Sequence, residues 1–119
     1  MPNPVTWFEI IGKDPIKLQK FYKDVFDWKL SEPVAEMANY SMLDHEGHGI
    51  GGGIGGDPTD QNRVSVYVEV TDLQGYLDKA EQAGATVMMP VTAVTPEVTI
   101  AMFADPEGNP IGLLKGVAH

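Results

Sequence analysis

Asp105-Pro106-Glu107-Gly108-Asn109-Pro110-Ile111-Gly112 is the second of two similar stretches in this chain. The first is Asp44-His45-Glu46-Gly47-His48-Gly49-Ile50-Gly51, in which Asp, Glu, Gly, Ile and Gly occur at the same spacing. Polar residues and breakers followed by an apolar segment are typical of a turn that leads into a strand. One turn that occurs twice, half a chain apart, indicates two copies of one structural unit.

The residues before each turn follow the same plan. Residues 5–11 alternate as a strand does, and Asp14 and Pro15 suit the N-cap and first position of a helix. That helix carries apolar residues at helical spacing, namely Leu18, Phe21, Tyr22 and Val25. Strands around 29–31, 38–43 and 50–54 are expected to follow, which makes the first half a βαβββ unit.

The second half repeats this pattern after a polar, glycine-rich linker at residues 55–62. A strand over 64–70 leads to Asp72, which suits the N-cap of a second helix, and strands are expected at 86–89, 99–103 and 111–114. We therefore predict an α+β fold of two tandem βαβββ repeats, residues 4–55 and 63–115. At 119 residues the chain has the length of a single domain.

Alternation along the two first strands separates an apolar face from a mixed one. Valines at 64, 66, 68 and 70 share one face, which is expected to pack on the helices. The opposite faces carry the candidate ligand-binding residues Trp7, Glu9, Ser65, Tyr67 and Glu69. If the sheet curls, these side chains line a cup, and Gly51 and Gly112 are expected to leave that pocket open.

Composition excludes several classes of function. Eight Lys and Arg against 17 Asp and Glu give a net charge of −9 without a basic stripe, so nucleic acid is not an expected partner. The chain has no cysteine, which excludes disulfides and thiolate chemistry. Neither a signal peptide nor a membrane-spanning run is recognisable, and a cytoplasmic location is the simplest interpretation.

The chain resembles the vicinal oxygen chelate superfamily, which includes glyoxalases, bleomycin-resistance proteins and extradiol dioxygenases. The stretches that carry the resemblance are Trp7-Phe8-Glu9-Ile10, Phe21-Tyr22-Lys23-Asp24-Val25-Phe26-Asp27-Trp28, Val68-Glu69-Val70-Thr71-Asp72-Leu73 and Phe103–Leu113. The resemblance covers essentially the whole chain. It implies a single domain with a cup-shaped mixed sheet and with helices on the convex side.

In metal-dependent members of the superfamily, four side chains in the cup hold a divalent ion. The resemblance places these ligands seven residues before each helix-capping Asp and seven residues after the Asp of each turn. Here those positions hold Trp7, Ser65, Gly51 and Gly112. Indole, a neutral hydroxyl and two glycines are not the ligands of a divalent ion, so we expect no metal and no cofactor.

The function that follows from the resemblance is binding of a small organic molecule in the cup, by sequestration as in bleomycin-resistance proteins. The pocket of such proteins is often built between two chains, which implies a homodimer. An alternative is a glyoxalase-like lyase, isomerase or oxygenase, metal-free or with a displaced metal, that uses Glu9 or Glu69 as general base. A third is a structural or regulatory subunit without a ligand.

Other side chains invite a catalytic or metal-binding interpretation. Glu9, Tyr67 and Glu69 are weak candidates for acid–base groups, because a carboxylate removed from water can transfer protons near neutral pH. His45 and His48 lie near acidic residues, but the second copy has Pro106 and Asn109 at their positions. A surface turn is therefore expected there.

Overall fold

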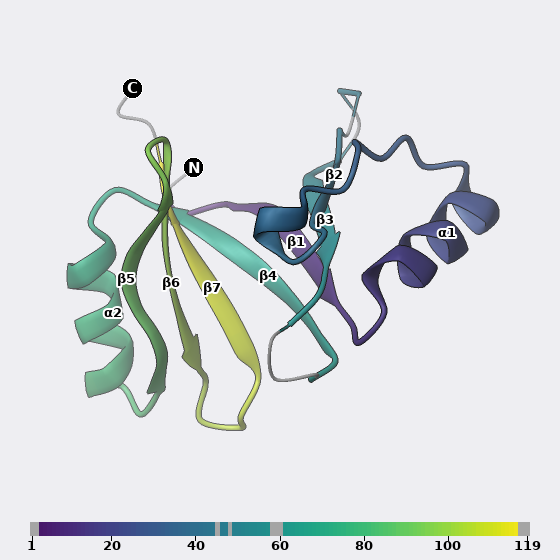
Figure 1. The fold of residues 1–119 in the computed structure, drawn as a ribbon. Helices are drawn as coiled ribbons and strands as arrows, with labels where there is room; N and C mark the ends of the chain where they lie inside the picture. Colours follow the sequence, from purple (N-terminus) through teal and green to yellow (C-terminus); the bar gives the residue numbers. More distant parts are fainter. Residues whose placement is uncertain (1–2, 45, 48, 58–60, 117–119) are drawn as a thin grey trace. The chain divides into compact units, whose positions relative to one another are not determined.

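The computed structural model describes residues 3–44, 46–47, 49–57 and 61–116 of the chain. Its elements are β1 (Val5–Ile11), α1 (Pro15–Phe26), the 3-10 helix η1 (Ala35–Met37), β2 (Ser41–Leu43), β3 (Gly51–Gly55), β4 (Arg63–Val70), α2 (Leu73–Gln82), β5 (Thr86–Thr95), β6 (Val98–Ala104) and β7 (Pro110–Lys115). The strands belong to one mixed sheet in the order β2-β3-β1-β4-β7-β6-β5 (Figure 1). The predicted α+β class is thereby confirmed.

The chain divides into two compact units. The first unit is Trp7–Val64, and the second combines Met1–Thr6 with Ser65–His119. The start of β1 thus belongs with the second unit, where the amide of Glu69 donates to the carbonyl oxygen of Pro4 at 2.8 Å. That the repeats 4–55 and 63–115 make a single domain stays a prediction.

The predicted first helix is present, with the predicted start. The Asp14 side chain accepts a hydrogen bond from the amide of Lys17 at 3.1 Å, and Pro15 occupies the first turn. The helix ends because Asp27 adopts a left-handed conformation with φ of 58°, and its amide donates to the carbonyl oxygen of Lys23. Gln19 anchors the inner face, where its amide group donates to the carbonyl oxygens of Asn39 and Ile54.

The strands of the first unit differ in part from the prediction. β3 pairs with β1 in parallel and with β2 antiparallel. The strand expected at 29–31 is reduced to one bridge between Leu30 and Leu43. The strand expected from residue 38 begins only at Ser41, because Ala38 and Asn39 have φ of 57° and 58° and leave the extended conformation.

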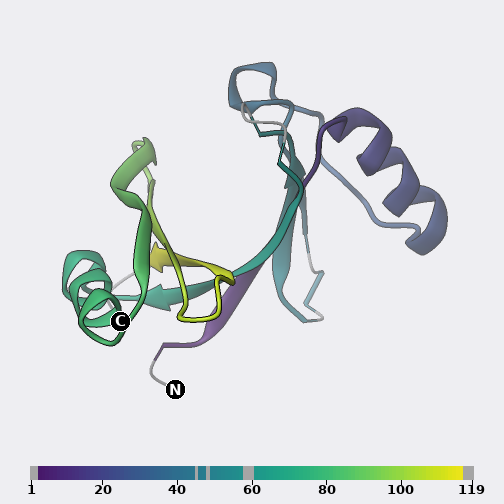
Figure 2. The same ribbon diagram turned by 90° about the horizontal axis from the view of Figure 1, so that it is seen from below.

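In the second unit the strands are hydrogen bonded in the order β4-β7-β6-β5. Helix α2 packs on β5, β6 and β7 (Figure 2). The core under it contains buried side chains from four elements, namely Val70, Leu73, Leu77, Ala101 and Leu113, with Val68 packed against them. The predicted valine face is confirmed at its C-terminal end, whereas Val64 is 69% exposed because it precedes the segment that α2 covers.

Strand β5 is longer than predicted and extends through Pro90 to Thr95. Proline removes a ladder donor and is tolerated at the edge of a sheet, which is where β5 lies. The pairing of β5 with β6 shifts register between Val87 and Met89 and again between Met89 and Thr92. Periodicity did not predict this extension, because proline usually indicates the end of a strand.

The repeated turn owes its form to its first residue. The Asp105 carboxylate accepts hydrogen bonds from the amides of Glu107 and Asn109, both at 2.9 Å, and from the Asn109 side chain at 3.0 Å. Gly108 has φ of 90°, a conformation that favours glycine. In the first copy the amide of Glu46 donates to Asp44 at 3.0 Å. The motif is therefore a structural turn in both places.

Candidate functional site

The predicted site residues Trp7 and Gly51 are direct partners across the parallel pair of β1 and β3. A Cβ atom at position 51 would lie 2.8 Å from Cζ3 of the Trp7 indole, closer than such atoms approach in proteins. The ring thus lies over the glycine backbone. The expectation that Gly51 leaves an open pocket was wrong at this position, because an aromatic side chain fills the space.

The second unit contains the same arrangement. Tyr67 on β4 is the partner of Gly112 on β7, and a Cβ atom at position 112 would overlap the Tyr67 ring. Tyr67 is buried. Here too the glycine accommodates a ring, and the expected opening is absent.

The strand pairing also shows which residue is the counterpart of Trp7. Counting back seven residues from Asp72 selects Ser65, but the residue opposite Gly112 is Tyr67. The path from the aromatic residue to the helix cap is two residues shorter in the second unit. The stretch Trp7-Phe8-Glu9-Ile10 therefore corresponds to Tyr67-Val68-Glu69-Val70, an alignment that the alternation of aromatic, apolar, acidic and apolar residues could have revealed.

Glu9 lies two residues beyond Trp7 and belongs to a hydrogen-bonded group within the first unit, which we call the Glu9 cluster. Its members are Trp7, Glu9, Tyr40, Asp57 and Arg63. The Trp7 indole N–H donates to the Tyr40 hydroxyl at 3.0 Å, and that hydroxyl donates to Oε2 of Glu9 at 3.1 Å. Arg63 donates to Oε1 of Glu9 at 3.2 Å and to Asp57 at 3.5 Å.

The Glu9 cluster is removed from bulk solvent. The Glu9 side chain is 11% exposed and the Arg63 side chain 22%. Both oxygens of Glu9 are engaged, so the carboxylate is fixed in position. The Nε–H of Arg63 is buried without a hydrogen-bond partner among the described residues. A buried donor of this kind is costly unless water or a bound molecule satisfies it.

Sequence reasoning found Trp7 and Glu9 but missed Tyr40, Asp57 and Arg63. Tyr40 follows the two left-handed residues Ala38 and Asn39, which periodicity does not detect. Its ring lies over Gly53, where a Cβ atom would overlap it. Arg63 could have been predicted as a site residue, because it is the only arginine of the chain and directly precedes the alternating residues 64–70.

The remaining predicted site residues lie in the second unit. Ser65 is buried, and its hydroxyl has no hydrogen-bond partner among the described residues. Glu69 is half-buried and lies beside Gly116, where a Cβ atom would be 2.5 Å from its Oε1. Within the part of the chain that the structure describes, no ion pair involves Glu69. Tyr67 and Glu69 therefore repeat Trp7 and Glu9 without an arginine beside the acid.

The positions that the resemblance assigns to metal ligands do not fit a metal. Gly51 and Gly112 have no side chain, and rings occupy the space above both. Trp7 uses its only polar atom as a donor to Tyr40. Among the described residues no three His, Cys, Asp or Glu side chains are grouped so that they could hold an ion. His45 and His48, expected in a surface turn, lie outside the described residues.

Comparison with known proteins defines the family. The model of the glyoxalase-like domain matches residues 9–114, and the chain belongs to this family. A protein of Mycobacterium bovis and Mycobacterium tuberculosis, CFP32, whose name includes the word glyoxylase, is 27% identical over 123 residues. The match covers 96% of this chain but only 46% of CFP32, so the chain spans about half the length of these relatives.

Two solved structures show the same fold. Methylmalonyl-CoA epimerase of Streptomyces coelicolor has a TM-score of 0.68 at 14% identity, over 99% of this chain and 100% of the epimerase. A glyoxalase/bleomycin resistance protein/dioxygenase superfamily member from Vibrio splendidus has a TM-score of 0.66 at 15% identity, over 96% and 99%. Together with the family model and the curated relatives, this shared fold confirms the predicted superfamily. None of the described helices is long and apolar enough to cross a membrane.

Proposed function

We propose that this protein binds a small organic molecule on the face of β1 that carries Trp7 and Glu9. The observation that supports this most strongly is the Glu9 cluster, in which an indole and a fixed carboxylate lie side by side on one strand. Binding sites commonly combine an apolar surface with a few oriented polar groups. An aromatic or cationic molecule suits this pair, because it can stack on the indole while the carboxylate orients it.

The ligand is expected to be bound without a divalent ion, as in a protein that sequesters its ligand. This part of the proposal rests on the side chains at the four metal-ligand positions, none of which is a His, Gln or carboxylate. The arginine in the cluster also favours binding over proton transfer at Glu9, since the carboxylate already has two partners. Glu9 is then a group that positions the ligand.

The alternative is a glyoxalase-like lyase, isomerase or oxygenase, and one observation favours a different base for it. Glu69 lies two residues from Tyr67, as Glu9 does from Trp7, but it has no ion pair among the described residues. A carboxylate without a fixed cation is better suited to accept a proton. In a catalytic protein, Glu69 rather than Glu9 is the candidate general base.

Binding and turnover can be separated in one experiment. A panel of small aromatic and cationic compounds is screened by the shift in melting temperature, and hits are measured by calorimetry. Each hit is then incubated with the protein and analysed by mass spectrometry and by exchange of its protons in deuterated water. Recovery of an unchanged, unexchanged ligand supports a binding protein. Turnover or exchange that is lost in Glu69→Gln and kept in Glu9→Gln supports the enzyme.

The proposal extends to assembly and location. A two-fold homodimer is the commonest closed assembly, and the chain exposes large apolar side chains that include Ile16, Val25 and Phe26 on α1. We place the protein in the cytoplasm, with neither nucleic acid nor a membrane as partner, on the basis of its acidic charge and lack of cysteine. Light scattering coupled to size exclusion should give twice the chain mass, and a monomer at high concentration would reject the dimer.

A further inference from the structure

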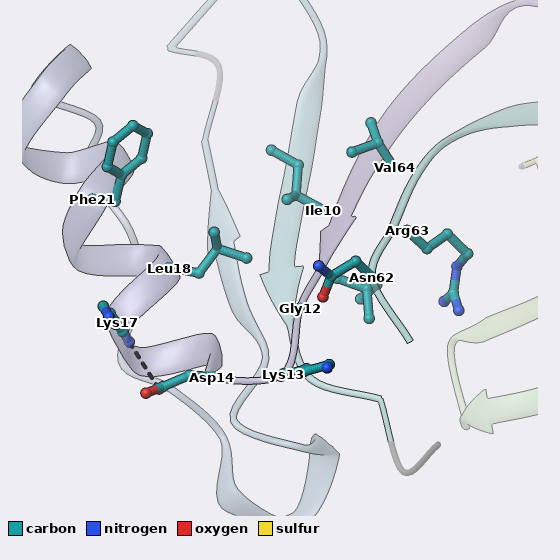
Figure 3. Close-up of a pocket in the computed structure, with 11 residues that line it drawn as sticks. Ile10, Gly12, Lys13, Asp14, Lys17, Leu18, Phe21, Asn62, Arg63 and Val64 are labelled. Atoms are coloured by element: carbon teal, nitrogen blue, oxygen red, sulfur yellow. Dashed lines mark hydrogen bonds between the residues drawn. The ribbon is translucent and has the colours of Figure 1, made fainter. Parts of the chain in front are cut away.

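A groove runs between α1 and the strands of the first unit, and the Glu9 side chain does not line it. Its volume is about 490 Å³. It is lined by residues of α1, β1, β4 and the loops next to them: Ile10, Ile11, Gly12, Lys13, Asp14, Lys17, Leu18, Phe21, Asn62, Arg63 and Val64 (Figure 3). Ile10 follows Glu9 on the strand, so the two side chains point to opposite faces of β1. The groove therefore lies on the helix side of the sheet.

The walls of the groove are apolar and incompletely covered. Leu18 from α1 and Ile10 from β1 face the same space, and both are half-buried (Figure 3). Phe21 is 55% exposed and Val64 is 69% exposed. Such side chains along one groove leave apolar area that a bound molecule would remove from water. The volume falls within the range of small-molecule sites.

The rim of the groove is basic, although the chain as a whole is strongly acidic. Five of its eight basic residues lie between residues 13 and 29, namely Lys13, Lys17, Lys20, Lys23 and Lys29. Two of these, Lys13 and Lys17, line the groove. Asp14 also lines it, but its carboxylate accepts the amide hydrogen of Lys17. Arg63 turns its guanidinium away from α1 (Figure 3). The guanidinium forms ion pairs with Glu9 and Asp57.

Charge and shape together define one class of ligand. An apolar floor with two lysines at its rim complements a molecule that has an apolar body and an acidic group at one end. We propose that the groove binds a single soluble amphiphilic anion, such as a medium-chain carboxylate, with its chain against Leu18, Phe21 and Val64 and its carboxylate at Lys13 and Lys17. This site is separate from the one proposed above on the Trp7 face and does not depend on it.

The test uses three probes with the same ten-carbon chain and different head groups: decanoate, decanol and decyltrimethylammonium, each below its micellar concentration. Calorimetry on the full chain should show the affinity order decanoate, then decanol, then the cation. Amide chemical shifts in NMR spectra should change at residues 10–21 and 62–64. Equal affinity for all three probes would mean that charge plays no part, and the proposal would fail.

Variants localise the site. In Lys13→Gln/Lys17→Gln we expect decanoate binding to weaken by about fivefold to tenfold and decanol binding to change by less than about twofold. The control, Lys20→Gln/Lys23→Gln, removes two positive charges from α1 outside the groove and should leave both affinities within about twofold. Equal losses in the two double variants would indicate general attraction to a basic helix and would overturn the proposal.

The apolar wall has its own test. Phe21→Ser should weaken decanoate and decanol alike, and because Phe21 is largely exposed the variant is expected to fold. Two results would assign the groove to another occupant. If Phe21→Ser loses a dimer that the wild type forms, and the wild type does not bind decanoate, the groove is where a second copy of the chain docks. Cosedimentation with phosphatidylglycerol vesicles, without binding of monomeric decanoate, would make it a membrane contact.

Discussion

The indole of Trp7 occupies the space that any side chain at Gly51 would need, since the two residues are partners across β1 and β3. Tyr67 and Gly112 stand in the same relationship in the second unit. In each unit, therefore, an aromatic ring occupies the space above a glycine of the neighbouring strand. The glycines make room for rings, and this has consequences for stability that can be measured.

Gly112→Ala is expected to destabilise the protein by about 1–3 kcal/mol, because the new methyl group must displace the buried Tyr67 ring. The measurement is urea denaturation of the single variant, of Tyr67→Ala and of the double variant. Tyr67→Ala removes the ring, so the second substitution should cost little in that background, and the coupling energy should exceed about 1 kcal/mol. Additive effects would show that the ring does not lie over the glycine.

The Glu9 cluster predicts a separation of binding from stability. Trp7→Phe retains a ring over Gly51 but loses the donor to Tyr40, and Glu9→Gln loses the charge opposite Arg63. Both should weaken binding of the molecule found by the screen by about tenfold or more, equivalent to about 1.4 kcal/mol. Their melting temperatures should stay near that of the wild type. Truncation to Trp7→Ala is unsuitable, because it would also empty the space above Gly51.

Removal of Arg63, in contrast, should lower the stability of the fold. Arg63→Gln leaves the carboxylates of Glu9 and Asp57 without their shared cation in a poorly solvated place. We expect a loss of about 1–3 kcal/mol in stability, larger than that of Glu9→Gln. The double variant Glu9→Gln/Arg63→Gln should recover part of the loss. If Arg63→Gln has the same melting temperature as the wild type, the ion pairs of the cluster contribute nothing to the stability of the fold.

Two valines of β4 provide a matched test of burial. Val70 is 2% exposed in the core under α2, whereas Val64 is largely in solvent. Val70→Asp should cost more than about 3 kcal/mol, because it buries an unpaired charge. Val64→Asp should change stability by less than about 0.5 kcal/mol. Chemical denaturation of the two variants decides, and equal losses would contradict the exposure of Val64.

These residues show what alternation in a sequence can predict. Alternation correctly separated the faces of β4 at Val68 and Val70. Both helix starts were predicted from Asp14, Pro15 and Asp72. Both kinds of pattern depend only on neighbouring residues. Alternation did not show how far each face is covered, which is why Val64 was expected to be buried. Coverage depends on where α2 lies, and α2 comes later in the chain.

The sequence patterns also did not predict how strands that are distant in the chain pair with one another. Counting back from the helix-capping Asp correctly paired Trp7 with Gly51. In the second unit it selected Ser65 in place of Tyr67 opposite Gly112, because the segment between the aromatic residue and the helix cap is two residues shorter there. Tyr40 reaches Glu9 only through the left-handed turn at Ala38 and Asn39. Local patterns determine which face a side chain occupies, whereas its partner depends on strand register and on turns without periodicity.

The last prediction concerns the turn that first revealed the repeat. Hydrogen bonds from the Asn109 side chain and amide, followed by those from the amides of Glu107 and Gly108, hold the pKa of Asp105 below its ordinary value of 3.8. A lowered pKa in the folded state means that ionised Asp105 stabilises the fold above pH 3.8 and that this contribution disappears as the pH falls through the folded pKa. Asn109→Ala should therefore lower the melting temperature at pH 7 and have a smaller effect near pH 2. Glu107→Ala, which keeps its amide donor, serves as the control and should change the melting temperature little at either pH. An Asn109→Ala effect of the same size at pH 2 and pH 7 would show that the turn does not depend on the charge of Asp105.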